Sequence, residues 1–391
     1  MKKPGALKGA YGALNGVYWM LCCLVYSFSS NFLLGRGYSN SQLGAIVAAG
    51  YILGLLLQPL AAYGADRGAK APATVLALSA GAIALVAAAL AFLPGKGPAV
   101  TAVYCLFLTL VIMLQPLVNA FAFYIERMGT PVPFGICRAI GSLAYGLLAA
   151  VLGGLIQRAG ENVVPVFALG TAALMGGIMV WFASAEAPAP PAPESGPRAP
   201  AGGGVLGDRS FRALLAGAAL LFFSHSFQSG YMLQIVRGVG GDHGDMGVLT
   251  LYVAVLELPA MFLFERLLRR FSCGGMLRFA AVFFAVKNLL VLGAGSLGGL
   301  YGGMSLQLVA YALFIPASVR YAGEAAGSGD VTRAQAYVTA MSTLGSVCAS
   351  GLGGVLIDRL GLRAALGATA LCACTGALVM VLGVRPIRQR Q

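Results

Sequence analysis

The chain has 391 residues, of which 59% are hydrophobic and 10% are charged, and its mean hydropathy is +0.83. This composition excludes an ordinary soluble domain and indicates a protein that lies in a lipid bilayer. The formal net charge is +13. Basic residues of membrane proteins gather in cytoplasmic loops, so this charge is expected without any nucleic-acid partner.

Twelve apolar runs follow one another along the chain. A helix needs roughly 20 apolar residues to cross a bilayer, and twelve such helices with short loops account for nearly the whole sequence. The predicted spans are 11–32, 42–63, 72–93, 99–122, 136–157, 163–183, 212–235, 246–264, 276–294, 299–319, 335–357 and 364–384. The first run is too long for the apolar region of a cleaved signal peptide, so we expect it to be retained. The sequence therefore predicts an all-α membrane protein with about 12 transmembrane helices.

Lysine and arginine are distributed unevenly over the predicted loops. When both termini are placed inside, the inside segments carry roughly three times as many basic residues as the outside segments. The outside segments hold Arg36, Lys96, Arg158, Arg237, Arg359 and Arg363. This distribution predicts a multi-pass protein of the cell membrane with both termini in the cytoplasm.

Proline and glycine crowd residues 185–207, which read AEAPAPPAPESGPRAPAGGGVLG. A segment of this composition cannot form a packed element and is typical of a flexible linker. Six spans lie on either side of it. The predicted organisation is an N-terminal six-helix bundle over 1–184, a cytoplasmic linker over 185–209 and a C-terminal six-helix bundle over 210–391.

The two halves share features at matching places. Spans two and eight each carry a tyrosine followed by a proline, Tyr51 and Pro59 in one and Tyr252 and Pro259 in the other. Spans four and ten share Leu-Gln, and spans five and eleven share Leu or Ile followed by Gly-Ser. Six-helix repeats are typical of transporters in which one half rocks against the other around a site at the middle of the bilayer.

A short motif after the second span indicates a known family. Residues 64–70 read GADRGAK and resemble the cytoplasmic signature of the major facilitator superfamily, an Asp-Arg pair followed by glycine and a basic residue. The motif departs from that signature at Ala62, which takes the place of the leading glycine, and at Gly68, which follows the arginine directly. The resemblance implies the major facilitator fold, with two six-helix pseudo-repeats and transport by alternating access.

Two further segments are similar to the lactose permease and phenylpropionate permease branch of that superfamily. Residues 124–127 read YIER and residues 134–142 read FGICRAIGS, as at the passage from span four to span five in those symporters. Ser224 and His225 resemble a pattern of the phenylpropionate branch. The resemblance implies that Arg138 contacts the solute.

The same resemblance marks two charged positions and three departures. Glu257 lies where the lactose symporters keep a substrate-binding glutamate, and Lys287 where they keep an arginine. Ala122 replaces their second sugar-binding acid, and Tyr311 and Phe314 replace the histidine and glutamate of their proton relay. Neither lactose as the solute nor that relay therefore follows from the resemblance.

Glu257 and Lys287 also stand out by their chemistry. A charged side chain at mid-bilayer costs about 2.5–3.5 kcal/mol, so pairing or function must offset its presence. The two residues would either form a structural ion pair or bind the solute or a proton in a central cavity.

His225 and Arg138 are the next candidates. His225, near the middle of span seven, is either a hydrogen-bonded structural residue or a second proton carrier, because imidazole titrates near neutral pH. Arg138 either anchors an anionic or hydroxyl-rich solute through its planar guanidinium or pairs with Glu126 at the cytoplasmic rim.

We expect a cavity lined by spans one, four, five, seven, eight and ten, with span nine supplying Lys287. The candidate solute- and proton-binding residues are Glu257, Lys287, Arg138, His225, Asn119, Gln115, Tyr311 and Gln228. The candidate cytoplasmic gate consists of Asp66, Arg67, Glu126 and Arg266.

The predicted function is secondary active transport, as proton-coupled symport of a small polar or amphipathic solute such as a sugar, a nucleoside or an aromatic acid, by a monomer. The sequence contains no phosphate-binding GxxxxGK[ST] motif and no HExxH motif, so neither direct ATP use nor a cofactor or metal is expected. One alternative is a proton-coupled efflux antiporter for hydrophobic compounds. Another is a lipid-handling membrane enzyme or a sensor, which the presence of only 2 histidines and the short tails disfavour.

Overall fold

The computed structural model describes residues 4–65, 71–127, 129–183, 205–326 and 331–385. Every regular element in those residues is helical. Eleven of these helices are long and apolar enough to cross a membrane, and the number is twelve when the bent pair α1–α2 counts as one span. Within the described residues, the prediction of an all-α protein with about 12 transmembrane helices is therefore confirmed.

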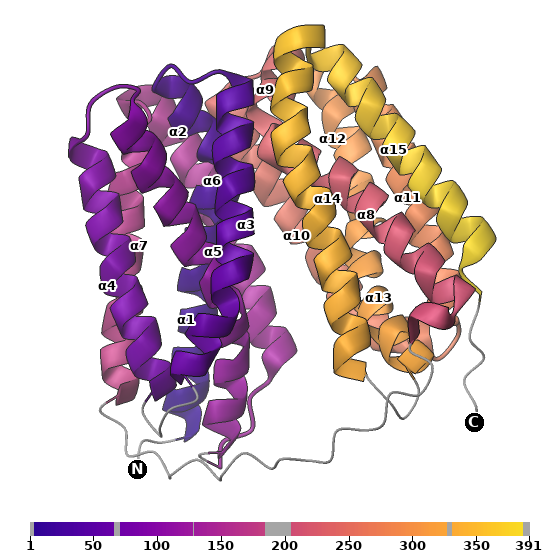
Figure 1. Ribbon diagram of the computed structural model, residues 1–391, viewed down its shortest axis with the longest axis horizontal. Helices are drawn as coiled ribbons and strands as arrows, with labels where there is room; N and C mark the ends of the chain where they lie inside the picture. Colours follow the sequence, from indigo (N-terminus) through magenta and orange to yellow (C-terminus); the bar gives the residue numbers. More distant parts are fainter. Residues whose placement is uncertain (1–3, 66–70, 128, 184–204, 327–330, 386–391) are drawn as a thin grey trace. The chain divides into compact units, whose positions relative to one another are not determined.

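The chain divides into two compact units, and the first comprises Met1–Glu194 together with His243–Ala254. Its helices run side by side (Figure 1), with α1 packed on α6, α3 on α5 and α4 on α7. They are α1 (Pro4–Tyr26), α2 (Ser29–Gly35), α3 (Asn40–Ala65), α4 (Ala71–Phe92), α5 (Pro98–Arg127), α6 (Phe134–Ala159) and α7 (Val163–Ala183).

The second unit comprises Ser195–Asp242 and Val255–Gln391. Its core is a buried apolar cluster from the packed helices α8, α11, α13 and α15, and includes Phe211, Leu277, Phe284 and Phe314. The remaining elements are η1 (Val205–Gly207), α8 (Arg209–Gly230), α9 (Met232–Gly238), α10 (His243–Leu268), α11 (Cys273–Gly293), α12 (Leu297–Ser305), η2 (Leu306–Leu308), α13 (Tyr311–Ala326), α14 (Val331–Leu360) and α15 (Leu362–Gly383). The first twelve residues of α10 belong to the first unit and the rest of the helix to the second.

Three predicted spans are interrupted where the sequence predicts one continuous helix. The first bends by 42° between α1 and α2, where the carbonyl of Cys23 accepts hydrogen bonds from the amides of both Ser27 and Phe28. The hydroxyls of Ser27 and Tyr145 also lie 2.7 Å apart. The bond from Phe28 spans five residues in place of the regular four, and such a break in the helical ladder is a recognised cause of bending.

The seventh and tenth spans are interrupted as well. Tyr231 separates α8 from α9, and its hydroxyl donates a hydrogen bond to the carbonyl of Ser350 on α14 at 2.6 Å. The tenth span consists of α12, the 3₁₀ turn η2 and α13. The first and seventh spans thus both end in a seven-residue helix, at matching places in the two halves.

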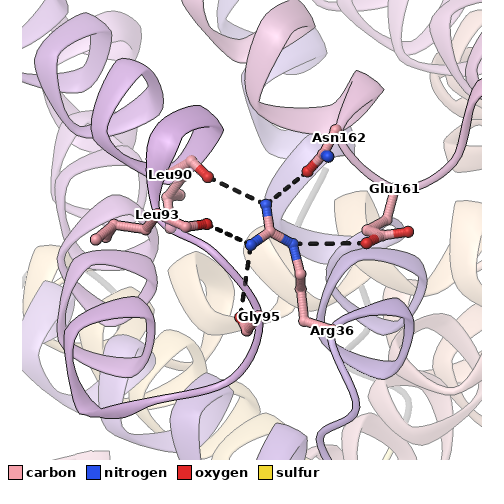
Figure 2. A network of polar contacts seen from close by, with 6 residues as sticks. All are labelled: Arg36, Leu90, Leu93, Gly95, Glu161 and Asn162. Carbon is pink, nitrogen blue, oxygen red and sulfur yellow. Dashed lines mark hydrogen bonds and ion pairs between the residues drawn. The ribbon is translucent and has the colours of Figure 1, made fainter.

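A buried arginine holds three chain segments together at one end of the first unit (Figure 2). Arg36, at the end of α2, donates to the carbonyl of Leu90 in the last turn of α4 and to that of Leu93 just after this helix, at 3.3 Å and 2.5 Å. It also donates to Oδ1 of Asn162 at 2.5 Å, and its Nε lies 3.5 Å from a carboxylate oxygen of Glu161. Arg36 lies in the turn after α2, where the sequence predicts a loop, and it is only 9% exposed. A planar guanidinium with five donors can satisfy several oxygens at once, which explains why arginine occupies this position.

Replacing Arg36 should destabilise the first unit. Arg36→Ala leaves buried carbonyls and an amide without a donor and Glu161 without its cation, and loss of one partner from such a buried network costs about 3 kcal/mol. Arg36→Lys keeps the positive charge but loses the planar guanidinium with its five donors, so the loss of stability should be intermediate. The measurement is the midpoint of thermal unfolding in detergent. Arg158→Ala, at an exposed arginine of the same unit, is the control, and equal midpoints for Arg36→Ala and this control would contradict the assigned role.

Close helix packing in the second unit depends on a glycine of α14. A Cβ atom added at Gly345 would lie 2.9 Å from the amide nitrogen of Phe223 and would also overlap the carbonyl oxygen of Ala219, both on α8. Small residues allow membrane helices to approach in this way.

We expect Gly345→Ala to lower the thermal unfolding midpoint, because overpacking of a tight helix crossing costs about 1–3 kcal/mol. Gly367→Ala on α15 is the matched control, because no heavy atom lies within 4 Å of the added Cβ. In a helix interior that change should be neutral or stabilising by up to about 1 kcal/mol. Equal midpoints for the two variants would show that the α8–α14 crossing tolerates a side chain.

Candidate functional site

Three polar side chains from separate elements of the second unit form a continuous hydrogen-bonded chain. Nζ of Lys287 on α11 donates to Oε1 of Gln307 in η2 at 2.5 Å. Nε2 of Gln307 donates to Oε1 of Glu257 on α10 at 3.0 Å. Lys287 and Gln307 are each 1% exposed. An amide thus bridges a cation and an anion inside the bundle.

A second amide pair lies beside this chain. Nε2 of Gln228 on α8 donates to Oδ1 of Asn288 at 3.0 Å, and Nδ2 of Asn288 donates to the carbonyl of Phe284 at 2.9 Å. Asn288 follows Lys287 directly on α11, so the two polar groups are neighbours along this helix. Both amide side chains are buried.

Oε1 of Gln228 is a buried acceptor with no hydrogen-bond partner among the described residues. Leaving a buried polar atom unsatisfied costs about 1–3 kcal/mol. A hydroxyl group or a water molecule that donated to this oxygen would remove that cost. The site can therefore accept a polar ligand group at this point.

An aromatic cluster flanks the polar residues. The imidazole of His225 on α8 stacks on the ring of Tyr311 on α13, with centroids 4.0 Å apart and planes inclined by 13°. Phe222 and Phe284 lie at its edges, with centroids 6.0 Å and 6.4 Å from that of His225. His225, Tyr311 and Phe222 are half-buried, whereas Phe284 is fully buried. The structure therefore combines ring faces with hydrogen-bonding groups in one unit.

Arg138 belongs to the first unit and makes a different set of contacts from those expected. Its guanidinium carbon lies 3.8 Å from the centroid of the Trp19 ring on α1, and Nη1 donates to the hydroxyl of Ser142 at 2.7 Å. Pairing with Glu126 was one of the two alternatives for Arg138; among the described residues no ion pair joins them, and Glu126 is exposed at the end of α5. The cation–π contact fixes Arg138 against α1.

The remaining predicted residues are distributed over both units. Gln115 and Asn119 lie one helical turn apart on α5 and are half-buried. Arg266 is exposed near the end of α10. Asp66 and Arg67, the other two predicted gate residues, lie outside the described residues.

The second unit thus holds five of the predicted residues: Gln307 joins Glu257 to Lys287, Asn288 bonds to Gln228, and His225 stacks on Tyr311. The site prediction omitted Gln307. The available signal was its place in the repeat, where Leu-Gln at 306–307 matches Leu-Gln at 114–115.

Comparison with known proteins gives consistent results. A profile of the MFS_1 like family matches residues 17–366. A maltose permease of Geobacillus stearothermophilus is 27% identical over 363 residues, which are 88% of this chain and 86% of that protein.

Two solved structures illustrate the likeness in fold. A mutant of the nucleoside transporter NupG superposes with a TM-score of 0.80 at 13% identity, covering 97% of this chain and 100% of that one. The xylose transporter XylE from E. coli, in an inward-open conformation, gives a TM-score of 0.74 at 12% identity, covering 100% of this chain and 98% of that one. The predicted fold and the predicted superfamily are therefore confirmed, and the chain belongs to the MFS_1 like family of major facilitator superfamily transporters.

Proposed function

We propose that the protein is a secondary active transporter that moves a small, hydroxyl-rich solute of the sugar class together with protons. The observation that carries the proposal is the hydrogen-bonded chain of the buried Lys287 and Gln307 with the half-buried Glu257. Ionisable groups inside membrane spans are expensive and typically mark ion or substrate paths. Glu257 is the group that we assign to proton exchange.

The choice of a sugar is supported by sequence and by chemistry. The relative that aligns over most of the chain is named a maltose permease. Amide, carboxylate and ammonium groups together offer both donors and acceptors to hydroxyl groups. The aromatic surface of the half-buried His225 and Tyr311 suits the apolar face of a sugar ring.

We further propose a monomer in the cell membrane with both termini in the cytoplasm. The excess of basic residues in the segments on that side supports this orientation. Glu126 and Arg266, exposed at the ends of α5 and α10, fit a cytoplasmic rim in each unit.

Glu257→Gln should uncouple transport from protons. In proteoliposomes with an imposed pH gradient, we expect loss of radiolabelled maltose accumulation, because the amide cannot release a proton. Equilibrium exchange of maltose should persist, because the neutral amide keeps the size and hydrogen bonding of the protonated acid. The measurement is uptake and counterflow in the same vesicles.

Glu324→Gln, which changes another carboxylate of the second unit, is the control and should retain accumulation. Normal accumulation by Glu257→Gln would remove Glu257 from the coupling mechanism. Absence of maltose counterflow in the unchanged protein would reject maltose as the solute.

A further inference from the structure

Gln307 occupies an unusual place in the backbone. The tenth span is interrupted at this residue, since α12 ends at Ser305, η2 covers Leu306–Leu308 and α13 begins at Tyr311. A 3₁₀ segment inside a long helix often marks a functional position or strain. The side chain of Gln307 nevertheless has two partners, one on α11 and one on α10. The break in the helix therefore places an amide between two charges.

The chemistry of the partners fixes the orientation of this amide. A lysine ammonium only donates hydrogen bonds, so the atom of Gln307 that faces Lys287 must be the oxygen. The NH₂ group then faces Glu257, whose carboxylate accepts. The opposite orientation would place donor against donor at 2.5 Å.

This orientation aligns the amide dipole with both charges. Its negative end faces the ammonium and its positive end faces the carboxylate, so the amide stabilises the charged form of each partner. Hydrogen bonds in series polarise one another at low dielectric. A change in the charge of Glu257 therefore alters the electrostatic environment of Lys287 through the amide.

We propose that Gln307 is a positioning residue that holds the carboxylate of Glu257 and couples its charge to that of Lys287. The inference rests on the proposed function, because it names the group that regulates the proposed proton site. Titratable groups of the elements around the amide are Glu257 on α10, Lys287 on α11, Tyr311 on α13 and His225 on α8. Gln307 itself does not ionise, and it acts only through its neighbours.

The test compares three variants at Gln307, together with Glu257→Gln alone, by the midpoint of thermal unfolding in detergent between pH 5 and pH 9. Gln307→Leu keeps the volume and removes both hydrogen bonds. Gln307→Glu places a second carboxylate beside Glu257. The double variant Glu257→Gln, Gln307→Glu restores one acid, one amide and one ammonium, but places the acid directly against Lys287.

We expect Gln307→Leu to change the shape of the midpoint-against-pH curve and not only its height. The double variant should recover stability beyond the sum of the two single changes, as coupled neighbours do. In the double variant, the pH at which the unfolding midpoint changes should be lower by about one unit, because a directly adjacent cation favours the ionised acid. Gln157→Glu makes the same chemical change at an exposed glutamine of α6 and should leave the curve unchanged.

Curves of the same shape for the unchanged protein, Gln307→Leu and the double variant would overturn the inference and leave Gln307 as a space-filling residue. Maltose uptake against pH in proteoliposomes is the second measurement, and its acidic limb should shift in the double variant in the same direction. If the unchanged protein moves no maltose, the sugar proposal fails, while the stability curves still decide the role of Gln307.

Discussion

The absence of water at bilayer depth is the constraint on which the structure depends. Backbone groups satisfy their hydrogen bonds by forming helices, and buried polar side chains must form theirs with groups of the same bundle. Lys287 donates to the oxygen of Gln307, and Arg36 donates to main-chain carbonyls and to Asn162. In both cases oxygens of the same unit replace water as hydrogen-bond acceptors, so each cation connects segments that are distant in sequence.

The two halves share an architecture but differ in the chemistry of their interiors. Each begins with a span that ends in a seven-residue helix, and matching spans carry Pro59 and Pro259. Two residues before these prolines, however, α3 has Leu57 and α10 has Glu257. The first unit keeps its buried arginine in the turns at the end of its helices, whereas the second unit places a lysine, an amide and a carboxylate within its spans. Our proposal of proton coupling therefore concerns the second unit.

Much of the fold could be predicted because apolar run length is a local property. The predicted spans agree with the helices to within a few residues, except where a span is interrupted. Those interruptions depend on contacts such as Ser27 with Tyr145 and Tyr231 with Ser350, which join residues about a hundred positions apart. Likewise, Glu257 and Lys287 could be singled out because charge in an apolar run is visible in the sequence, whereas an amide such as Gln307 is too common to stand out.

The sequence by itself determined that this is a membrane protein of about 12 spans in two similar halves. It also determined which charged residues carry an insertion cost that pairing or function must offset. Only the tertiary structure decided the partners: Gln307 lies between Lys287 and Glu257, and Arg138 lies on Trp19 rather than beside Glu126. The physical reason is that the hydropathy of a segment depends on residues that are adjacent in the sequence, whereas a hydrogen bond depends on distance in space. The residues of the Lys287–Gln307–Glu257 chain are 20 and 50 positions apart in sequence, and no periodicity within one helix could have joined them.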